Sequence, residues 1–516
     1  MHVLAYTPRG AEGLIIRVET DIRRGIPGID ITGLAEGAVR EARERVRASF
    51  RNSGFTFPLD RILINLAPAG MRKEGASLDL PIAVSVMVAA GMVPAPDKLM
   101  VLGELELSGR VRPVRGVLAA LTAGLAAGIG DFIVPLENSS EAALLPGISF
   151  FAAATLAEVV HALQVRAETG KLPDGGTGNA TGEADSGIWA GDFSEVHGQS
   201  RYKLALEIAA AGGHNLLVFG PPGSGKTMLA RRFPSIMPPL EAEEAVEVTR
   251  LHSLLGLIEG GGLIRQPPFR SPHHSASAEG VLGGGRNIRP GEITLAHLGT
   301  LFLDEAPEFR SPVLQSLREP LEDRVITIVR AEGPHRLPAD FQLILAANSC
   351  PCGRLGADSA KITDSGCFCS PDEIRRYWRK LGSALLDRID LRIPVRAPGI
   401  LTPGGEGGET SSEIRRRVMA AVETQKERFK GSGTRRNSGM FPAQIDKFCP
   451  LTKKAEEAFI LASAKLGLSG RACHSIIKIA RTIADLEGSD SIDIVHILEA
   501  VQHRRFGDDP YDILSI

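Results

Sequence analysis

Asn215 to Thr227 reads NLLVFGPPGSGKT, and this stretch specifies the fold of the central part of the chain. Residues 216–219 are apolar and predict a strand, which runs directly into a glycine-rich turn and then a helix. The turn has the spacing G-x-x-x-x-G-K-T of a phosphate-binding loop, in which backbone N–H groups wrap phosphate oxygens at the N-terminus of a helix. The predicted loop consists of Gly220, Pro221, Pro222, Gly223, Ser224, Gly225, Lys226 and Thr227. This context favours an ATP site over an ordinary glycine-rich turn between a strand and a helix.

Charged and hydroxyl groups around this loop have predicted roles in ATP hydrolysis. Lys226 is expected to reach the β- and γ-phosphates, and Thr227 to hold Mg²⁺. A second apolar strand, 300–303, ends in Asp304 and Glu305. Asp304 is expected to bind Mg²⁺ directly or through water, and Glu305 to polarise the attacking water. An acidic pair alone could equally cap the next helix, but after a phosphate loop the catalytic interpretation is favoured.

A third predicted strand, 341–347, ends at Asn348, whose amide can orient the attacking water without adding charge. This order of phosphate loop, acidic strand and asparagine-ending strand resembles the AAA+ ATPases. That resemblance implies two further site residues. Arg388, in LLDRIDL, resembles the arginine finger that AAA+ rings insert into a neighbour's ATP site, and Arg471 resembles the second sensor arginine. The alternatives are a surface salt bridge with Asp387 or Asp390 for Arg388, and an ordinary helix-start residue for Arg471.

Length and composition bound the class of protein. A chain of 516 residues is long enough for about three domains. Because the net charge is −2, nucleic acid could be contacted only through a local patch. The longest apolar runs, 80–93 and 116–129, are shorter than the roughly 20 residues that a bilayer requires, and they predict buried core helices. No secretory signal pattern opens the sequence, so a soluble, cytoplasmic protein without a membrane partner is expected.

Two glycine-rich polar segments, 168–189 and 398–412, predict flexible linkers. They delimit an N-terminal part (1–167), a central part (190–397) and a C-terminal part (413–516). Alternating strand-like and helix-like stretches predict an α+β fold for the first part, and strands alternating with helices predict a parallel α/β sheet for the second. The third part predicts a helical bundle, with helices near 413–429, 453–466, 472–487 and 492–504.

Further motifs extend over nearly the whole chain. They are GIDITGL at 28–34, AVREARERVR at 38–47, NLAPA at 65–69, PFRSPHHS at 268–275, PGEITLAH at 290–297 and LLDRIDL at 385–391. Together they resemble the ComM/YifB family, bacterial AAA+ ATPases related to the magnesium-chelatase ATPase subunit. This resemblance implies a homo-hexamer that uses ATP and Mg²⁺ to move single-stranded or branched DNA in recombination during natural transformation, with no other small-molecule substrate. A chelatase-type ATPase and a protein-remodelling ATPase are the alternatives.

The same resemblance implies an insertion in the second helix of the central domain and a hairpin before the sensor asparagine. About 75 residues separate Thr227 from Asp304, which leaves room for the insertion, and Val325 to Pro338 is the expected hairpin. Arginines in these glycine- or proline-punctuated loops are the predicted contacts to DNA phosphates. They are Arg286, Arg289, Arg330 and Arg336.

The N-terminal part resembles the Lon-protease/ribosomal-S5-type fold. Lon proteases use a Ser nucleophile that a Lys activates. In KEGASLD, Ser77 stands at the nucleophile position, but in GRVRPVRGVL, Leu118 stands where Lon has its Lys. Without that amine Ser77 has no base. We therefore expect a domain without peptidase activity, retained for contacts with DNA or with other subunits.

Four of the six cysteines form two close pairs, Cys350-Pro-Cys352 and Cys367-Phe-Cys369. Four thiolates match tetrahedral Zn²⁺, and a cytoplasmic location disfavours disulfides. The alternative is a cluster of free thiols under a surface loop. A zinc site here would be structural and would stiffen the chain between Asn348 and Arg388. His273 and His274 lack an evident third ligand, so a packing or polar-network role is expected for them.

Overall fold

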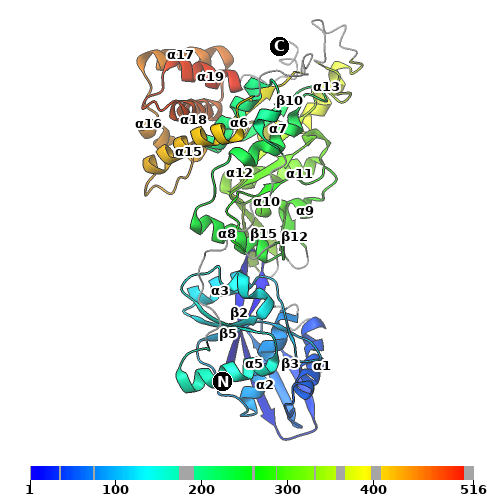
Figure 1. The fold of residues 1–516 in the computed structure, drawn as a ribbon. Helices are drawn as coiled ribbons and strands as arrows, with labels where there is room; N and C mark the ends of the chain where they lie inside the picture. Colours follow the sequence, from blue (N-terminus) through cyan, green and yellow to red (C-terminus); the bar gives the residue numbers. More distant parts are fainter. Residues whose placement is uncertain are drawn as a thin grey trace.

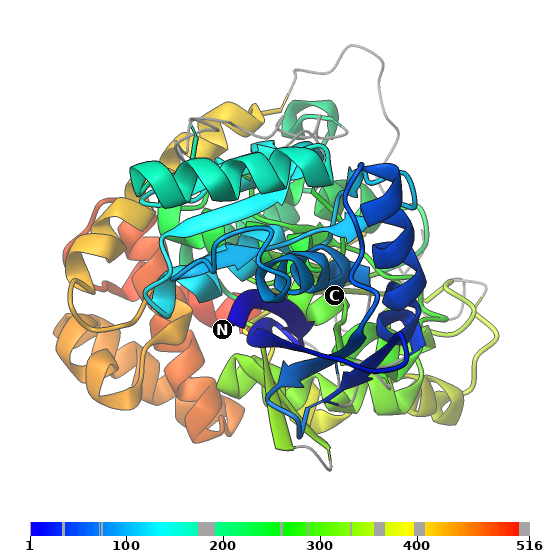
Figure 2. The same ribbon diagram turned by 90° about the horizontal axis from the view of Figure 1, so that it is seen from below.

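The computed structural model describes residues 2–33, 37–71, 73, 76–173, 191–258, 262–285, 288–330, 333–355, 367–396 and 408–504. An N-terminal body lies below a central body, and a helical C-terminal bundle lies beside the central one (Figure 1). Seen from below, the N-terminal body covers much of the central body, while the bundle projects at one side (Figure 2). Over the described ranges no helix has both the length and the apolar character to span a membrane.

The N-terminal body is built on a seven-stranded sheet with the order β3-β4-β2-β1-β5-β8-β9. Strands β1, β2 and β4 pair antiparallel and the other pairs are parallel. The strands are β1 His2–Arg9, β2 Glu12–Arg23, β3 Gly28–Thr32, β4 Arg61–Ala67, β5 Leu99–Val101, β8 Asp131–Pro135 and β9 Ser149–Ala153, with a small hairpin of β6 Glu104–Leu105 and β7 Val111–Arg112. The helices are α1 Gly37–Asn52, α2 Asp79–Ala89, α3 Val117–Ala126, α4 Ser139–Ala142 and α5 Leu156–Thr169.

Helices α2 and α3 form from the two long apolar runs. Ten of the eleven residues of α2, from Asp79 to Val88, are buried, and so is most of the first half of α3. Both helices are therefore core helices, as predicted.

The central body contains a five-stranded sheet with the order β11-β14-β17-β10-β18, and all of its strand pairs are parallel. The predicted parallel sheet is thus confirmed. Its strands are β10 Leu216–Phe219, β11 Phe269–Arg270, β14 Thr300–Leu303, β17 Gln342–Ala347 and β18 Leu391–Pro394. The surrounding helices are α6 Ser200–Gly212, α7 Lys226–Arg232, α11 Ser311–Ser316, α12 Arg318–Asp323, α13 Pro371–Arg379 and α14 Ser383–Leu386.

Two excursions leave this sheet. The first, between α7 and β14, contains α8 Ala242–Ser253, α9 Ala278–Leu282, α10 Glu292–Leu295 and the short pair β12 Gly283–Gly284 and β13 Arg289–Pro290. The second is an antiparallel hairpin of β15 Val325–Arg330 and β16 Gly333–Pro338, in which Val325 pairs with Pro338. The hairpin expected over this range is confirmed.

The C-terminal bundle consists of α15 Ser411–Arg428, α16 Pro442–Phe448, α17 Lys453–Leu466, α18 Gly470–Leu486 and α19 Ile494–Arg504. Its apolar residues share one core cluster with α6 and β10 of the central body, so the bundle packs directly on that body. The predicted helical character of this part is confirmed.

The predicted linkers are longer than the structure allows at two ends. Helix α5 continues to Thr169 and ends on Gly170 in the left-handed conformation, two residues beyond the predicted start of the first linker. Helix α15 begins at Ser411, because Thr410 and Glu413 form a capping box. Linker residues 174–189 and 398–407 lie outside the described residues.

The N-terminal body packs against helix α8 of the central body. Leu240, Val248 and Leu254 from this region share a buried apolar cluster with α3. The backbone N–H of Gly116 also donates to the carbonyl of Ser253 at 3.1 Å. The apolar seam and this hydrogen bond join the N-terminal body to the excursion between α7 and β14.

Candidate active site

The phosphate-binding loop lies at the carboxyl edge of the central sheet. Gly223 (φ 75°) and Gly225 (φ 83°) adopt the left-handed conformation that the tight turn needs. The Ser224 hydroxyl donates to the carbonyl of Pro221 at 2.8 Å and closes the turn. Helix α7 begins at Lys226, so the loop amides stand at a helix N-terminus, where anions are favoured.

Sheet register brings the other predicted groups to this loop. Phe219 pairs with Ala347, so Gly220 and Asn348 follow at the same edge. The Thr227 hydroxyl donates to Asp304 Oδ2 at 2.8 Å, and Lys226 Nζ donates to Asn348 Oδ1 at 3.3 Å. The cluster at this edge therefore combines Lys226 and Thr227, at the start of α7, with the residues that follow β14 and β17, Asp304 and Asn348.

The ammonium group of Lys226 is enclosed. It donates to the carbonyl oxygens of Gly220 at 2.9 Å and Pro221 at 2.8 Å. Burial lowers the pKa of Lys226 to about 8, although the carboxylates of Asp304 and Glu305 counteract this shift. A phosphate group beside this amine would favour its charged form and offset the cost of burial.

Glu305 is held in an unusual backbone conformation. Its φ is 51°, in the left-handed region that non-glycine residues rarely adopt. Its backbone N–H donates to Asp304 Oδ1 at 3.0 Å, and its side chain is about half exposed. The carboxylate is thus accessible to solvent, which suits a group that polarises water.

Three residues beside the site had no predicted role in it: Gln199, Tyr202 and His274, the last of which was expected to have a packing or polar-network role. His274 Nδ1 lies 3.7 Å from Glu305 Oε2, and the rings of His273 and His274 lie 4.1 Å apart. Gln199 Nε2 donates to the carbonyl of Ser224 at 3.1 Å, and the Tyr202 hydroxyl donates to the carbonyl of Lys226 at 3.2 Å. The motif PFRSPHHS was the available signal for His274; nothing in the local pattern distinguishes Gln199 or Tyr202.

Arg388 and Arg471 lie at the opposite, amino edge of the sheet. The side chain of Asn215, the residue before β10, donates to the backbone carbonyl of Arg388 at 3.1 Å. A strand of four residues spans roughly 13 Å, so Arg388 is separated from the loop at the other end of β10. The structure therefore does not bring Arg388 to the ATP-site residues of its own chain.

One carboxylate joins the two arginines. Glu322 Oε1 lies 2.7 Å from Arg388 Nη2 and 2.6 Å from Arg471 Nη2. From the sequence, the alternative for Arg388 was a salt bridge with Asp387 or Asp390. In the structure Arg388 pairs with Glu322 instead. Arg471, which resembles the second sensor arginine in the sequence, also lies near Arg388 and not near Lys226. Both arginines line a cavity of about 300 Å³ with Arg324 and Lys478.

The four predicted cysteine ligands also meet. The Sγ atom of Cys350 lies 3.4 Å from that of Cys352 and 3.7 Å from that of Cys367, and Cys352 Sγ lies 3.6 Å from Cys367 Sγ. All four, with Cys369, lie within 4.8 Å of one another. A tetrahedral zinc ion with Zn–S bonds of 2.3 Å separates its sulfurs by about 3.8 Å. The donor set and its spacing thus fit Zn²⁺.

The thiol pKa values differ within this cluster. Burial raises the pKa of Cys350. Burial also opposes ionisation of Cys352, but the N–H of Arg354 and the neighbouring thiols outweigh it and lower the pKa of Cys352 to about 6. A partly ionised thiol among four is a favourable first ligand for a divalent cation.

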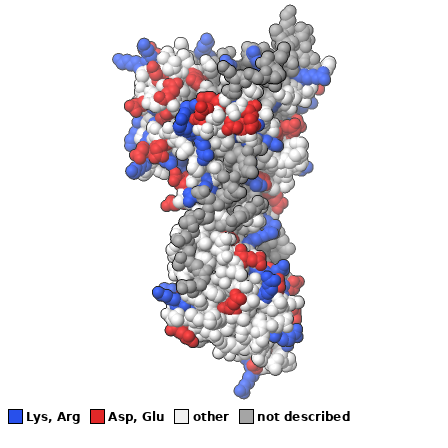
Figure 3. Space-filling model, in the orientation of Figure 1, with Lys and Arg blue, Asp and Glu red and all other residues white. Residues whose placement is uncertain are grey.

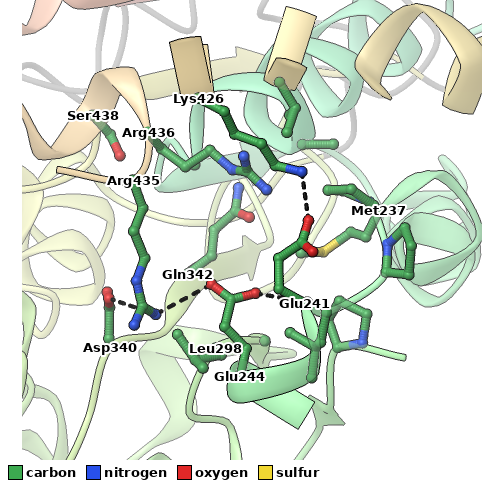
Figure 4. Close-up of a pocket in the computed structure, with 18 of the residues that line it drawn as sticks. Met237, Glu241, Glu244, Leu298, Asp340, Gln342, Lys426, Arg435, Arg436 and Ser438 are labelled. Atoms are coloured by element: carbon green, nitrogen blue, oxygen red, sulfur yellow. Dashed lines mark hydrogen bonds and ion pairs between the residues drawn. The ribbon is translucent and has the colours of Figure 1, made fainter. Parts of the chain in front are cut away.

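A larger cavity of about 550 Å³ lies between α8 and α15, and no residue of the phosphate loop lines it. Glu241 of the α8 N-cap pairs with Lys426 of α15, and Glu244 of α8 pairs with Arg435 at 3.5 Å (Figure 4). Arg436 extends into the same space (Figure 4). These ion pairs tie the bundle to the helix that carries the N-terminal body, so this cavity is a seam between the parts of the chain.

In the N-terminal body, Ser77 lies just before α2 and Leu118 is buried in α3. Leu118 occupies an apolar core position and its N–H donates to Glu141 Oε1 at 2.8 Å. Lys73 Nζ donates to the carbonyls of Gly33, at 2.8 Å, and Pro68. Among the described residues, no basic side chain forms a hydrogen bond to Ser77.

The predicted DNA-contacting arginines lie on the two excursions. Arg330 and Arg336 are exposed on the hairpin, and Arg330 Nη2 donates to the carbonyl of Gly285 at 3.2 Å. Arg289 is exposed on the adjoining pair of short strands, whereas Arg286 lies outside the described residues. On the face drawn in Figure 3, acidic and basic side chains are mixed, which agrees with the net charge of −2.

Comparison with known proteins covers each part of the chain. Family models described as "Magnesium chelatase, subunit ChlI", "Subunit ChlI of Mg-chelatase" and "Magnesium chelatase, subunit ChlI C-terminal" match residues 192–400, 18–138 and 408–504. The uncharacterized protein YifB of Salmonella typhimurium is 41% identical over 495 residues, covering 95% of this chain and 94% of its own. The competence protein ComM of Haemophilus influenzae is 39% identical over 501 residues, covering 96% and 95%.

A weaker similarity concerns one part only. The Lon protease of Geobacter metallireducens is 26% identical over 150 residues, which is 28% of this chain and 18% of that protein. The Lon-like N-terminal homology predicted from the sequence is thus supported, and the family implies ATPase activity for the central domain. The relatives match nearly from end to end, and the chain belongs to the ComM/YifB family of magnesium-chelatase-like AAA+ ATPases.

Proposed function

We propose that the protein is a homo-hexameric, Mg²⁺- and ATP-dependent translocase that moves single-stranded or branched DNA in the cytoplasm. One observation supports assembly of the protomers into a ring. The phosphate loop, Asp304 and Asn348 stand at one edge of the sheet, and Arg388 and Arg471 stand at the other. A head-to-tail arrangement of protomers would place the second edge of one against the first edge of the next, and such contacts form a ring when the rotation between neighbours closes.

Each group has a chemical role in this proposal. Hydrolysis forms a bond between a water oxygen and the γ-phosphorus and breaks the bond from that phosphorus to the oxygen that remains on ADP. Glu305 accepts the proton of the attacking water, which Asn348 orients. Lys226 and the loop amides compensate charge on the β- and γ-phosphates. Thr227 and Asp304 would hold Mg²⁺, which supplies further charge neutralisation.

The neighbour's arginines complete the site. Negative charge on the transferring phosphoryl group is stabilised by a guanidinium supplied from outside, as with arginine fingers in other ATPases and GTPases. We assign this role to Arg388, with Arg471 beside it on the same face. Because ATP then lies between two protomers, hydrolysis would depend on assembly.

DNA is the proposed substrate because of the hairpin and the adjoining loop. Arg289, Arg330 and Arg336 are exposed on these excursions. Repeated around a ring, they would offer phosphate contacts without reading the base sequence. One relative is named a competence protein. That name describes the relative, and a DNA substrate for the present protein is compatible with it.

The deciding experiment is the ATPase rate of wild type without DNA, with single-stranded DNA and with forked DNA, with Glu305→Gln as the catalytically dead control. We expect clear stimulation by both DNA substrates, falling with added salt. ATPase activity that ignores DNA would contradict the translocase and favour a chelatase-type or protein-remodelling role. Triple substitution of Arg289, Arg330 and Arg336 by Ala should remove the stimulation and leave the rate without DNA unchanged.

We also propose that one structural Zn²⁺ is bound by Cys350, Cys352, Cys367 and Cys369. The supporting observation is the spacing of their sulfur atoms. Metal analysis of purified protein should give one zinc per chain, and Cys350→Ser and Cys367→Ser should reduce it. Cys473→Ser, in α18 outside the cluster, is the matched control and should retain zinc.

For the N-terminal domain, proposed boundaries 1–167, we propose a docking role without peptidase activity. The position of Lon's Lys is occupied by buried Leu118, whose helix packs toward α8. Casein or peptide cleavage that is lost in Ser77→Ala would overturn this proposal.

A further inference from the structure

The cysteine cluster lies against the phosphate-binding loop. Gly353, which follows the ligand Cys352 directly, has φ 76°. A Cβ atom at this position would lie 2.7 Å from Cγ and 2.9 Å from Cδ of Pro222. Real Cβ atoms do not approach so closely, so the backbone of the ligand loop and the ring of Pro222 are in direct contact. Pro222 is part of the loop that would surround the phosphates of ATP.

The ligand loop is short and closed. The N–H of Gly353 donates to the carbonyl of Cys350 at 3.0 Å, so Gly353 is fixed to one ligand by a hydrogen bond and to another by a peptide bond. A zinc ion bound to Cys350 and Cys352 would hold both ends of this turn. The position of Gly353, and hence of the surface that meets Pro222, would then depend on the metal.

A second connection reaches the strands of the ATP site. Cys350 stands two residues after Asn348. The carbonyl of the intervening Ser349 accepts a hydrogen bond from Trp378 Nε1 at 3.1 Å. The Trp378 ring packs edge-on against Phe219, the last residue of β10, with 5.4 Å between centroids. Buried aromatic contacts of this kind hold the end of β10 and the end of β17 together.

The other two ligands lead to the helix that carries Trp378. Cys369 is followed by Ser370, which caps α13 in a capping box with Glu373. A metal ion shared by the two cysteine pairs would therefore cross-link the segment after Asn348 to the start of α13. Both connections from the cluster converge on the carboxyl ends of β10 and β17, where Lys226 and Asn348 meet.

We infer that the four-cysteine zinc site is a metal-dependent brace that positions Pro222 and Asn348 for ATP. The inference rests on the proposed ATP and zinc sites and adds a role for the metal in the ATPase itself. Gly353 is a positioning residue, since it acts through Pro222 and does not touch the reacting atoms. Groups that hold metal ligands in place typically contribute a factor of about 10 to 100 to metal affinity or activity, and we expect a change in ATP kinetics at the lower end of this range.

The most specific test leaves all four ligands in place. Gly353→Ala should retain one zinc per chain, because no cysteine is changed, yet raise KM for ATP about 10-fold by displacing Pro222. Gly431→Ala is the matched control: Gly431 has φ 75°, but its added Cβ would meet no atom within 4 Å. The control carries the same backbone strain and should keep the wild-type KM. Equal KM values in Gly353→Ala and Gly431→Ala would overturn the brace.

A second variant tests the metal. Cys352→Ser should lose zinc and show the same rise in KM, whereas Cys473→Ser should change neither. Thermal unfolding of each variant identifies a protein that has lost its fold. A folded Cys352→Ser protein that lacks zinc but has wild-type KM and kcat would also overturn the brace.

The same assays separate this inference from the proposals beneath it. If wild type fails to hydrolyse ATP, or Lys226→Ala hydrolyses it normally, the proposed ATP site is wrong. If wild type contains no zinc after purification without chelators, the metal proposal is wrong. If wild type hydrolyses ATP and contains zinc, but Gly353→Ala and Cys352→Ser both keep the wild-type KM for ATP, the brace alone is wrong.

Discussion

The two edges of the central sheet differ in the charged groups that they hold. At the carboxyl edge, hydrogen bonds pair Lys226 with Asn348 and Thr227 with Asp304. The amino edge gathers Arg388 and Arg471 on the single carboxylate of Glu322. In a parallel sheet these edges are separated by the length of the strands. One protomer therefore holds both halves of the proposed chemistry and cannot bring them together.

Removal of the arginine finger should have the strongest consequence. Arg388→Ala should lower the ATPase kcat by about 1000-fold, because the charge of the transferring phosphoryl group loses its external guanidinium. ATP binding should persist, since the phosphate loop is unchanged. Steady-state kinetics with fluorescent-nucleotide binding in parallel measures both. Unaltered turnover in Arg388→Ala would refute this division of the chemistry between the two edges.

Mixed rings test directly whether the two edges of different protomers meet. Glu305→Gln and Arg388→Ala are each expected to be inactive alone. In randomly mixed rings, about a quarter of the sites combine an intact Glu305 with a neighbour's intact Arg388, as a head-to-tail contact requires. Mixing should therefore restore up to about a quarter of wild-type ATPase activity. No recovery from mixtures shown to co-assemble would contradict shared sites.

Arg471 should contribute less than Arg388 to the rate of ATP hydrolysis, and it should also act on the ATP of a neighbouring protomer. Arg471→Ala is expected to lower kcat by about 10- to 100-fold, as for loss of one electrostatic donor. Mixed with Glu305→Gln, it should recover activity just as Arg388→Ala does. A defect that mixing cannot repair would show that Arg471 serves the ATP of its own chain.

The weakest effect is expected at Glu322. Hydrogen bonds from Arg471 and, next, from Arg388 hold the pKa of Glu322 below its usual value. A carboxyl group whose pKa is lowered in the folded state stabilises that state above its unfolded pKa, and this contribution is lost as pH falls. Since Glu322 is 42% exposed, the contribution should be below about 1 kcal/mol. Wild type and Glu322→Gln should thus differ slightly in Tm at pH 7, and the difference should shrink as the pH falls below 4.5.

Local patterns accounted for the elements that bear the ATP site. The run from Asn215 to Thr227 specifies a strand, a turn and a helix from consecutive residues, and the structure has these elements in that order. The hairpin of β15 and β16 could likewise be expected from one continuous stretch. In contrast, one end of each predicted linker was misplaced by two residues, because capping by Gly170 and Thr410 extends the helices beyond the change in composition.

Contacts between segments that are far apart in the chain could not be predicted from the sequence. Residues 322, 388 and 471 come from α12, the segment before β18 and α18, and no local pattern marks them as neighbours. The approach of His274 to Glu305 and of Gly353 to Pro222 is of the same kind. Each pair depends on how strands are ordered in the sheet and how loops fold over it.

The family, the parallel α/β core and the residues of the phosphate loop could all be read from the amino-acid order, because short runs encode them and their geometry follows from adjacent residues. The meeting of two arginines on one carboxylate away from the loop, and the contact of the cysteine turn with Pro222, became visible only in the folded chain. Packing across the sheet sets those distances, and packing is a property of the whole molecule.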